Sequence, residues 1–276
     1  MARLFNQFRH LPTPKFDLRK TLSRFESFAD VIERKKAIVK VLRKGNRADR
    51  CLAKKLRKCK KDRRCLSGAC PVCRRRMRMW FFGEIQEVFK VLADEQVIHL
   101  TIICPKLQFE PNELNTMIPR NVVNRLTTIL RRLKFTDEVI LGALDYDWCV
   151  DDNKCAEGYW QVHYHLICPS LSKAQLDALR KVLPNKPASY IPRAIVSKSI
   201  KARTKQFSYV LKPFFRERSS FVGDDGKRRT KKGRIKNAYL RRELFRHLDQ
   251  HPLTDSLVLF RARRAGGDIR PAEFCR

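Results

Sequence analysis

Two apolar segments separated by a short polar connector constrain the fold of this chain more than any other feature. VILGALDYDWCV spans residues 139–150, and GYWQVHYHLIC spans residues 158–168. Segments of this length, rich in β-branched and aromatic residues, are typical of strands, and the polar connector DDNKCAE between them predicts an antiparallel hairpin. We expect this hairpin to lie at the centre of a sheet and to support whatever chemistry the chain performs.

Other elements are predicted on both sides of the hairpin. VIHLTIICP at 97–105 reads as a further core strand that Pro105 ends. Ser172 and Gln175 form a capping-box pattern for a helix that runs to about Leu183. Further helices are predicted at 28–44, 75–93, 121–134 and about 203–212, and a β-like piece is predicted at 189–197. The pattern predicts an α+β fold, with an antiparallel sheet of about five strands, helices mainly on one face and the functional site on the other.

Charge is distributed unevenly along the 276 residues. The net charge is +33, and residues 1–90 carry 27 basic and 8 acidic side chains, residues 201–247 carry 16 and 4, and residues 91–200 carry 13 and 12. A near-neutral core between basic arms is typical of a protein that binds the phosphates of a polyanion. The alternative is a sticky basic surface without a specific site. No apolar run long enough for a membrane span and no apolar signal core occur, so we expect a cytoplasmic protein without a membrane partner.

Two histidines and two aspartates mark a candidate metal site. His163 and His165 are two residues apart on one predicted strand, so their side chains share a face. Asp145 and Asp147 share a face of the neighbouring strand by the same parity, and either could supply an oxygen ligand. Imidazole and carboxylate together suit Mn²⁺ and tolerate Mg²⁺. The alternative is a pair of exposed histidines on an edge strand.

A tyrosine and a lysine form a second candidate group. In FSYVLK at 207–212, Tyr209 and Lys212 would share a face if the segment is helical. A phenol is a weak nucleophile at neutral pH, and a nearby cation would favour its phenolate. Pro213 limits how far this helix can extend. Taken alone, the pair fits an ordinary amphipathic tyrosine and a solvated lysine better than a catalytic pair.

A cysteine cluster precedes the predicted core. Cys65, Cys70 and Cys73 have the spacing of metal ligands, and Cys59 or Cys51 could supply a fourth thiolate. Such a set predicts a structural Zn²⁺ site in a reducing compartment, against the alternative of free buried thiols. The adjoining Arg74, Arg75 and Arg76 would then be presented to phosphates. Cys149 and Cys155 flank the connector and could pair or bind metal, but we expect two free thiols, whereas Cys104 and Cys168 are expected to be small core residues. His99 is expected to have a structural role.

In chain order, these segments resemble the HUH endonucleases, and more closely the rolling-circle plasmid initiators with one catalytic tyrosine. The matching stretches are LTIICP, GALDYD, WQVHYHLI and YVLK, within residues 97–212, and the cysteine cluster also resembles one that precedes the catalytic core in those initiators. The resemblance implies a DNA nickase in which His163, His165 and Asp145 hold the divalent cation. Tyr209 would attack the strand and Lys212 would orient the phosphate, leaving a 5′-phosphotyrosyl intermediate and a 3′-hydroxyl primer.

The resemblance also implies partners: single-stranded or hairpin DNA at a replication origin, and a host helicase and polymerase. One departure is that Lys205 and Gln206 stand where the initiators often carry a glutamate that activates water. A transposase or relaxase of the same superfamily could use the same residues. A non-catalytic zinc-containing protein that binds nucleic acid is a candidate from a different class.

Four regions follow from these patterns. They are a basic helical region at 1–48, a zinc-binding cysteine cluster and helix at 49–94, the catalytic core at 95–215 and a basic region that contacts DNA at 216–276. Within the last region, residues 217–242 are predicted to form a mobile arm. Its candidate DNA-binding residues are Lys227, Arg228, Arg229, Lys231 and Lys232.

Overall fold

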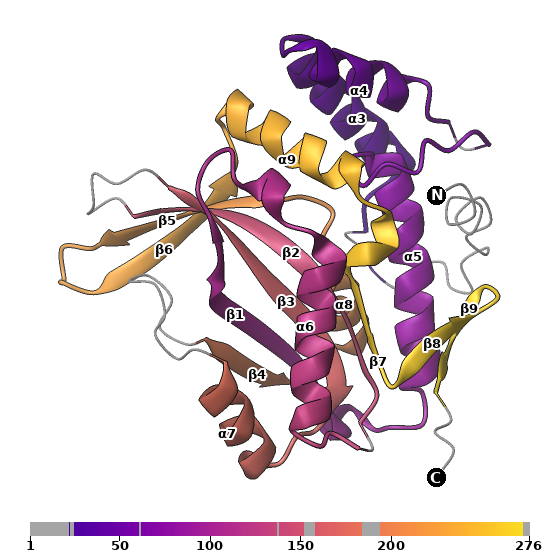
Figure 1. The fold of residues 1–276 in the computed structure, drawn as a ribbon, viewed down its shortest axis with the longest axis vertical. Coiled ribbons are helices and arrows are strands. Elements are labelled where there is room, and N and C mark those ends of the chain that lie inside the picture. Colours follow the sequence, from indigo (N-terminus) through magenta and orange to yellow (C-terminus); the bar gives the residue numbers. More distant parts are fainter. Residues whose placement is uncertain are drawn as a thin grey trace.

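A computed structural model shows an α+β fold around one curled, mixed sheet (Figure 1). The structure describes residues 22, 25–60, 62–136, 138–151, 158–183 and 194–272. The helices are α3 (Phe28–Arg43), α4 (Arg47–Arg57), α5 (Pro71–Val88), α6 (Pro119–Arg132), α7 (Lys173–Val182), α8 (Arg203–Tyr209) and α9 (Ala238–Gln250). The strands are β1 (Val97–Phe109), β2 (Ile140–Asp151), β3 (Tyr159–Pro169), β4 (Ile195–Ser199), β5 (Arg216–Val222), β6 (Arg228–Arg234), β7 (Leu257–Phe260), β8 (Ala262–Ala265) and β9 (Asp268–Pro271).

The predicted central hairpin is confirmed. β2 and β3 pair antiparallel, with Asp145 opposite His163 and Ala143 opposite His165. Gly142 allows this pairing, because a Cβ there would lie 2.3 Å from the backbone oxygen of His165. The glycine of the GALDYD segment therefore permits a close approach of β2 to the histidine strand.

The sheet is larger than predicted, and it is mixed. Its described strands run in the order β4-β1-β3-β2-β5-β6, and β7 also pairs with β2. β5 runs parallel to the end of β2, whereas β7 pairs antiparallel with its beginning. The expectation of an antiparallel sheet of about five strands was therefore wrong in strand number and in direction. Strands β5 and β6 come from a basic part of the chain and lack the apolar runs that mark core strands, whereas β7 is a short apolar run that the sequence analysis missed.

Helices cover both faces of the sheet, which corrects the expectation that they lie mainly on one face. Leu126 of α6 and Leu244 of α9 belong to the core on one face, together with Leu166 of β3. Phe81 of α5 and Phe207 of α8 belong to the core on the other face, together with Ile167 of β3. The second face holds helices because α5 has a wide apolar stripe, with Met77, Trp80, Phe81, Phe82 and Ile85 all buried.

Strand β1 continues past Pro105, although the proline was expected to end it. The register with β3 shifts between Ile103 and Gln108, so Pro105 lies within an irregularity of the ladder. A proline is tolerated there because the ladder does not require its missing N–H. Gln161 of β3 spans the irregularity by donating to the Cys104 carbonyl at 3.1 Å.

The predicted mobile arm at 217–242 is instead regular structure. β5 and β6 form an antiparallel hairpin that extends the sheet, and α9 begins at Ala238. Gly226 has φ +69 in the connecting turn, a conformation that favours glycine. These strands contain many basic and few apolar side chains, so no apolar periodicity in the sequence predicted the strands. A further helix, α4, was not predicted, and Asn46 and Asp49 form its capping box.

Some predictions fall outside the described residues, namely the part of the β-like piece at 189–193, the hairpin connector with Cys155, and the first 21 residues. Within the residues that the structure describes, no helix has the length and apolar character needed to cross a membrane.

Candidate active site

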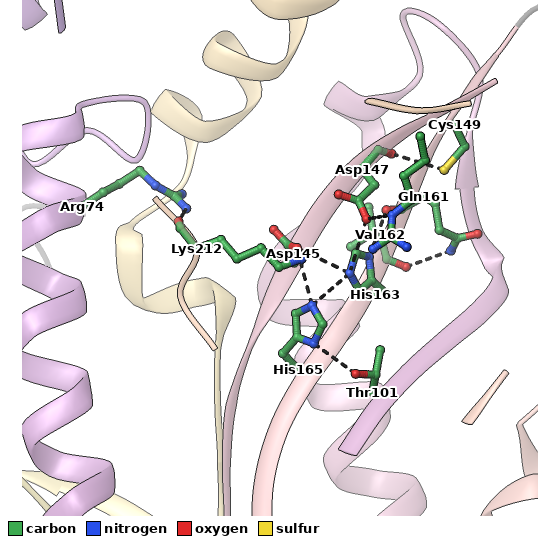
Figure 2. A network of polar contacts seen from close by, with 11 residues as sticks. Arg74, Thr101, Asp145, Asp147, Cys149, Gln161, Val162, His163, His165 and Lys212 are labelled. Atoms are coloured by element: carbon green, nitrogen blue, oxygen red, sulfur yellow. Dashed lines mark hydrogen bonds and ion pairs between the residues drawn. The ribbon is translucent and has the colours of Figure 1, made fainter. Parts of the chain in front are cut away.

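Asp145, His163 and His165 converge on one point of the sheet (Figure 2). The Nε2 atoms of the two histidines are 3.2 Å apart, and Asp145 Oδ2 lies 3.4 Å from His163 Nε2 and 3.6 Å from His165 Nε2. Ligands about 2.1 Å from one ion lie about 3.0 to 3.5 Å apart in octahedral or tetrahedral geometry. All three side chains are buried. The three residues could therefore hold a metal ion without rearrangement of the sheet.

The other ring nitrogens of the histidines are engaged by neighbouring groups. Thr101 Oγ1 lies 3.2 Å from His165 Nδ1, and the Gln161 carbonyl lies 3.4 Å from His163 Nδ1. Such contacts fix ring orientation and tautomer, leaving the Nε2 lone pairs for a ligand. Burial lowers the pKa of His165 well below its ordinary value, so this ring is a neutral ligand at physiological pH.

Asp147 lies beside this group and has a different partner. Its Oδ2 is 3.7 Å from His163 Nε2 and accepts a hydrogen bond from Arg218 Nε, which belongs to β5. Its Oδ1 is buried without a hydrogen-bond partner in the described part of the chain. The sequence left Asp145 and Asp147 as alternatives for the oxygen ligand, and Asp145 is the one that faces both histidines.

Lys212 reaches into the same site. Its ammonium forms a buried ion pair with Asp145 Oδ2. Burial opposes the charge of this lysine, but the carboxylates of Asp145 and Asp147 raise its pKa above the ordinary value. Burial also opposes ionisation of Asp145, but Lys212 and the two neighbouring histidines together outweigh burial, so the pKa of Asp145 lies well below its usual range. Both groups are charged at neutral pH.

Tyr209 packs between the histidines and Lys212. Its half-buried ring meets the edge of the His165 ring at a centroid distance of 5.1 Å, and Lys212 Nζ lies 4.6 Å from its centroid. Helix α8 ends at Tyr209, so Lys212 lies beyond the helix and the predicted shared helical face was wrong. The two side chains still meet, because the chain bends at residues 210 and 211 after the helix ends.

His99 contributes a third histidine to the neighbourhood of the tyrosine. Its ring centroid lies 5.2 Å from that of His165 and 5.9 Å from that of Tyr209. Burial, together with Lys198 and Lys212, lowers the pKa of His99 to about 4. His99 is not in the metal-ligand group. It supports the wall of the site as a neutral ring.

Three arginines donate hydrogen bonds to backbone carbonyls of the segment 208–213, which contains the tyrosine. Arg78 donates to the Ser208 carbonyl at 3.3 Å, Arg74 to the Lys212 carbonyl at 3.0 Å, and Arg34 to the Pro213 carbonyl at 2.8 Å. Helix termini leave such carbonyls without partners, and cationic donors stabilise them. The basic helices α3 and α5 thereby position Tyr209 and Lys212 against the sheet.

The four cysteines form a second metal-ligand group. The sulfur of Cys73 lies 3.7 Å from that of Cys59 and 3.8 Å from that of Cys65, and Cys70 completes the set. Thiolates about 2.3 Å from a tetrahedral ion lie about 3.8 Å apart. Cys59 therefore takes the fourth position, whereas Cys51 is exposed on α4 and outside the group. The group could bind a metal ion and anchor the start of α5.

The other predicted DNA-contacting residues occupy two places. Arg74 and Arg75 make internal contacts, since Arg75 donates to the Glu26 carbonyl at 3.3 Å, and Arg76 is half-buried. Lys227, Arg229, Lys231 and Lys232 are exposed on the β5–β6 hairpin and its turn, and Arg228 lies at the start of β6. β6 lies on the side of β5 that faces away from β2, and Lys232 of β6 is opposite Arg218 of β5. The exposed basic residues of the hairpin therefore lie one strand further from the metal-ligand group than Arg218.

Sequence reasoning missed Thr101, Arg218 and Arg34 as parts of the site. Thr101 lies two residues after His99 in LTIICP, and strand parity places the two side chains on one face. Arg218 and Arg34 belong to elements far from β3 in the chain, and no local spacing relates them to it.

No family model matches this chain, and no curated protein or solved structure matches it either.

Proposed function

We propose that the protein nicks and rejoins single-stranded DNA, with Tyr209 as the nucleophile and a divalent cation bound by Asp145, His163 and His165. The observation that carries the proposal is the contact of the Tyr209 ring with His165, 5.1 Å between centroids, in a site that also holds Lys212. A candidate nucleophile beside a candidate metal site and a buried cation is the combination of groups expected at a site of phosphoryl transfer. Together with the order of these segments, the group supports an assignment to the HUH endonucleases and their fold.

In the proposed reaction, Tyr209 Oη attacks the scissile phosphorus as the bond from phosphorus to the 3′ oxygen breaks. The phenol loses its proton, and the leaving 3′ oxygen takes one up. Lys212 binds a phosphate oxygen and stabilises charge in the transition state. Mn²⁺ or Mg²⁺, when bound, polarises the phosphate. The 5′ phosphate stays on Tyr209, and the free 3′ hydroxyl serves as a primer for rolling-circle replication.

Release of the tyrosine proceeds by strand transfer in this proposal. Gln206, where a glutamate could activate water, accepts hydrogen bonds from the backbone N–H groups of Lys201 at 2.7 Å and Ala202 at 3.0 Å. A side chain committed to this helix end offers no general base. A second 3′ hydroxyl therefore attacks the phosphotyrosyl bond, rejoining DNA.

The cellular setting follows from the same proposal. A cytoplasmic initiator of this kind binds a single-stranded or hairpin origin, and host helicase and polymerase extend the 3′ end. Zn²⁺ is the metal proposed for the four cysteines, because a closed thiolate set suits a structural zinc site.

A non-catalytic, zinc-containing protein that binds nucleic acid is the second candidate. The cysteine group and the net charge of +33 support it equally well. Nicking of end-labelled single-stranded DNA in the presence of Mn²⁺ separates the two. The substrate pool should contain candidate origins from the DNA element that encodes the protein.

We expect cleavage by the parent protein and by Tyr239→Phe, since Tyr239 is an exposed tyrosine on α9, and none by Tyr209→Phe. Chelation of the divalent ion should also abolish cleavage. DNA that is bound but not cut on any cognate candidate would favour the binding protein.

A further inference from the structure

A cavity of about 310 Å³ lies apart from the metal site, between α3, the start of α5, the segment after Lys212 and α9. Its volume is at the lower end of the range for small-molecule sites. None of Asp145, His163, His165 or Tyr209 lines it, and it has no acidic residue in its wall. The wall consists of Arg34, Ala37, Ile38, Ala69, Pro71, Arg74, Pro213, Phe214, Phe215, Arg234, Ile235, Arg241, Leu244 and Phe245.

The polar part of the wall carries an excess of positive charge, although Arg34 also forms an ion pair with Glu26 just outside the wall. Four of the lining residues are arginines that come from α3, α5, β6 and α9. Burial and the neighbouring arginines Arg78, Arg74, Arg234 and Arg75 lower the pKa of Arg34 to about 10. Among the described residues, Arg74 Nε is buried without a hydrogen-bond partner. Clustered arginines with an unused donor favour a bound anion, and phosphate matches the fork of a guanidinium.

The rest of the wall is apolar and aromatic. Phe215 lies under the Arg74 guanidinium, 4.5 Å from its ring centroid, and Phe214 is 42% exposed beside Arg216. Ile38, Leu244 and Phe245 complete this part of the wall. Aromatic faces next to arginines bind the bases and phosphates of single-stranded nucleic acid. A free inorganic anion would leave this apolar surface without a partner.

The cavity also lies close to the reactive segment along the chain. Pro213, Phe214 and Phe215 directly follow Lys212, and the Lys212 carbonyl accepts a hydrogen bond from Arg74. A smaller neighbouring cavity is lined by Lys212 and Arg78 and shares Arg74 with the larger one. The two cavities share part of their walls, so the larger one adjoins the surroundings of Lys212.

We propose that this cavity binds one unpaired nucleotide of the DNA strand, with its base against the apolar wall and its phosphate on the arginines. The inference rests on the DNA-binding part of the proposed function and does not depend on nicking. Occupation of the cavity would fix which phosphate reaches Tyr209.

The test measures DNA binding under conditions in which the proposed nicking reaction cannot occur. A fluorescent oligo-dT of about 12 nucleotides, within the usual site size for single strands, is titrated with the full-length Tyr209→Phe protein without added divalent metal. Ala37→Trp fills the cavity from α3, and Ala29→Trp is its matched control, because Ala29 is an exposed alanine of the same helix outside the wall. Thermal melting of both variants checks that they are folded.

We expect Ala37→Trp to weaken binding by about tenfold or more, the effect of losing one stacked base, and Ala29→Trp to change it by less than about twofold. A second measurement uses an oligonucleotide of the same length in which every base is replaced by an abasic site. This oligonucleotide should bind more weakly than oligo-dT to the protein with the unmodified cavity, and the difference should shrink in Ala37→Trp.

Equal binding of oligo-dT and of the fully abasic oligonucleotide would overturn the proposal, whether or not Ala37→Trp folds, because it would mean that only phosphates are recognised. A folded Ala37→Trp protein with unchanged affinity would overturn it as well. The result does not depend on nicking, because every protein in this test carries Tyr209→Phe. Failure of the proposed nicking activity would therefore be seen separately.

Discussion

The carboxylate of Asp145 serves two partners that compete for it. It faces the Nε2 atoms of both histidines and also pairs with the buried ammonium of Lys212. A cation at this distance opposes the binding of a second cation, the metal ion. Lys212 therefore weakens metal binding in the absence of DNA, and in the proposed reaction it turns to the phosphate.

Replacing Lys212 by methionine should consequently separate metal binding from chemistry. We expect Lys212→Met to bind Mn²⁺ about tenfold more tightly by calorimetry, because a unit charge is removed. Nicking should fall by about a hundredfold or more, because a donor to the transition state is lost. Lys205→Met, an exposed lysine of α8, should change neither. Weaker or unchanged Mn²⁺ binding in Lys212→Met would contradict the shared role of Asp145.

Gly142 is the second residue on which the site depends. An alanine Cβ there would meet the His165 carbonyl at 2.3 Å and force β3 to shift. Overpacking of this kind costs about 1–3 kcal/mol, so Gly142→Ala should lower the free energy of urea unfolding by that amount. Gly233→Ala on β6 is the control, because nothing lies within 4 Å of its Cβ. Equal stability of the two variants would show that β2 and β3 are not so close.

Among the elements, α5 links the cysteine group to the tyrosine. Cys70 and Cys73 lie at its start, and Arg74 follows directly and holds the Lys212 carbonyl. A metal ion bound by the four cysteines would stabilise this helix end, because such ions contribute to folding outright.

Cys59→Ser should therefore lose most of the bound zinc, and its melting temperature should be lower than that of the parent protein. Nicking should also be lost, although no residue of the candidate active site has changed. Cys51→Ser should retain zinc, stability and activity, because Cys51 is exposed and outside the group. Metal analysis with thermal melting measures both. Loss of zinc from Cys51→Ser, with retention in Cys59→Ser, would reverse the assignment of the fourth ligand.

Helix α9 gives the fold a predictable dependence on pH. Its fully buried His247 lies with Nε2 3.3 Å from the Tyr146 hydroxyl on β2. Burial, and then the nearby His251, lower the pKa of His247 from 6.5 to about 3. Between these values the unfolded chain binds a proton that the folded chain does not. Stability from His247 is therefore complete above pH 6.5 and is lost as the pH falls toward 3.

The free energy of unfolding should fall by up to about 1.4 kcal/mol per pH unit from this group alone. His247→Gln should remove that part of the slope between pH 6 and 4 in urea titrations. The comparison with the parent protein cancels other titrating groups, including Glu243, whose pKa burial raises. Identical slopes for the two proteins would mean that His247 is not buried as a neutral ring.

The elements also show how far the sequence could predict the molecule. Strands β2 and β3 were predictable because both are apolar and lie next to each other in the chain, and parity then placed His163, His165 and Asp145 on one face. β5 and β6 were not, because their basic residues carry no apolar period, and their positions follow from pairing with β2 and with each other. Arg218 reaches Asp147 only through that pairing.

At the scale of the whole molecule, the two basic parts of the chain surround the proposed path of the DNA. The N-terminal helices α3 and α5 supply Arg34, Arg74 and Arg78 next to the tyrosine segment, and the β5–β6 hairpin extends the sheet on another side (Figure 1). The near-neutral middle of the chain forms the strands that carry the metal-ligand group. This arrangement fits the proposed function, in which the basic flanks would bind phosphates and the near-neutral core would perform the chemistry.

The central claim is that Tyr209 becomes joined to DNA. The most direct measurement incubates the protein with Mn²⁺ and cognate single-stranded DNA, digests both, and maps any nucleotide adduct by mass spectrometry. The account predicts one adduct, on the peptide that contains Tyr209, absent from Tyr209→Phe and absent after chelation. Cleavage without an adduct, or an adduct on another tyrosine such as Tyr239, would contradict it.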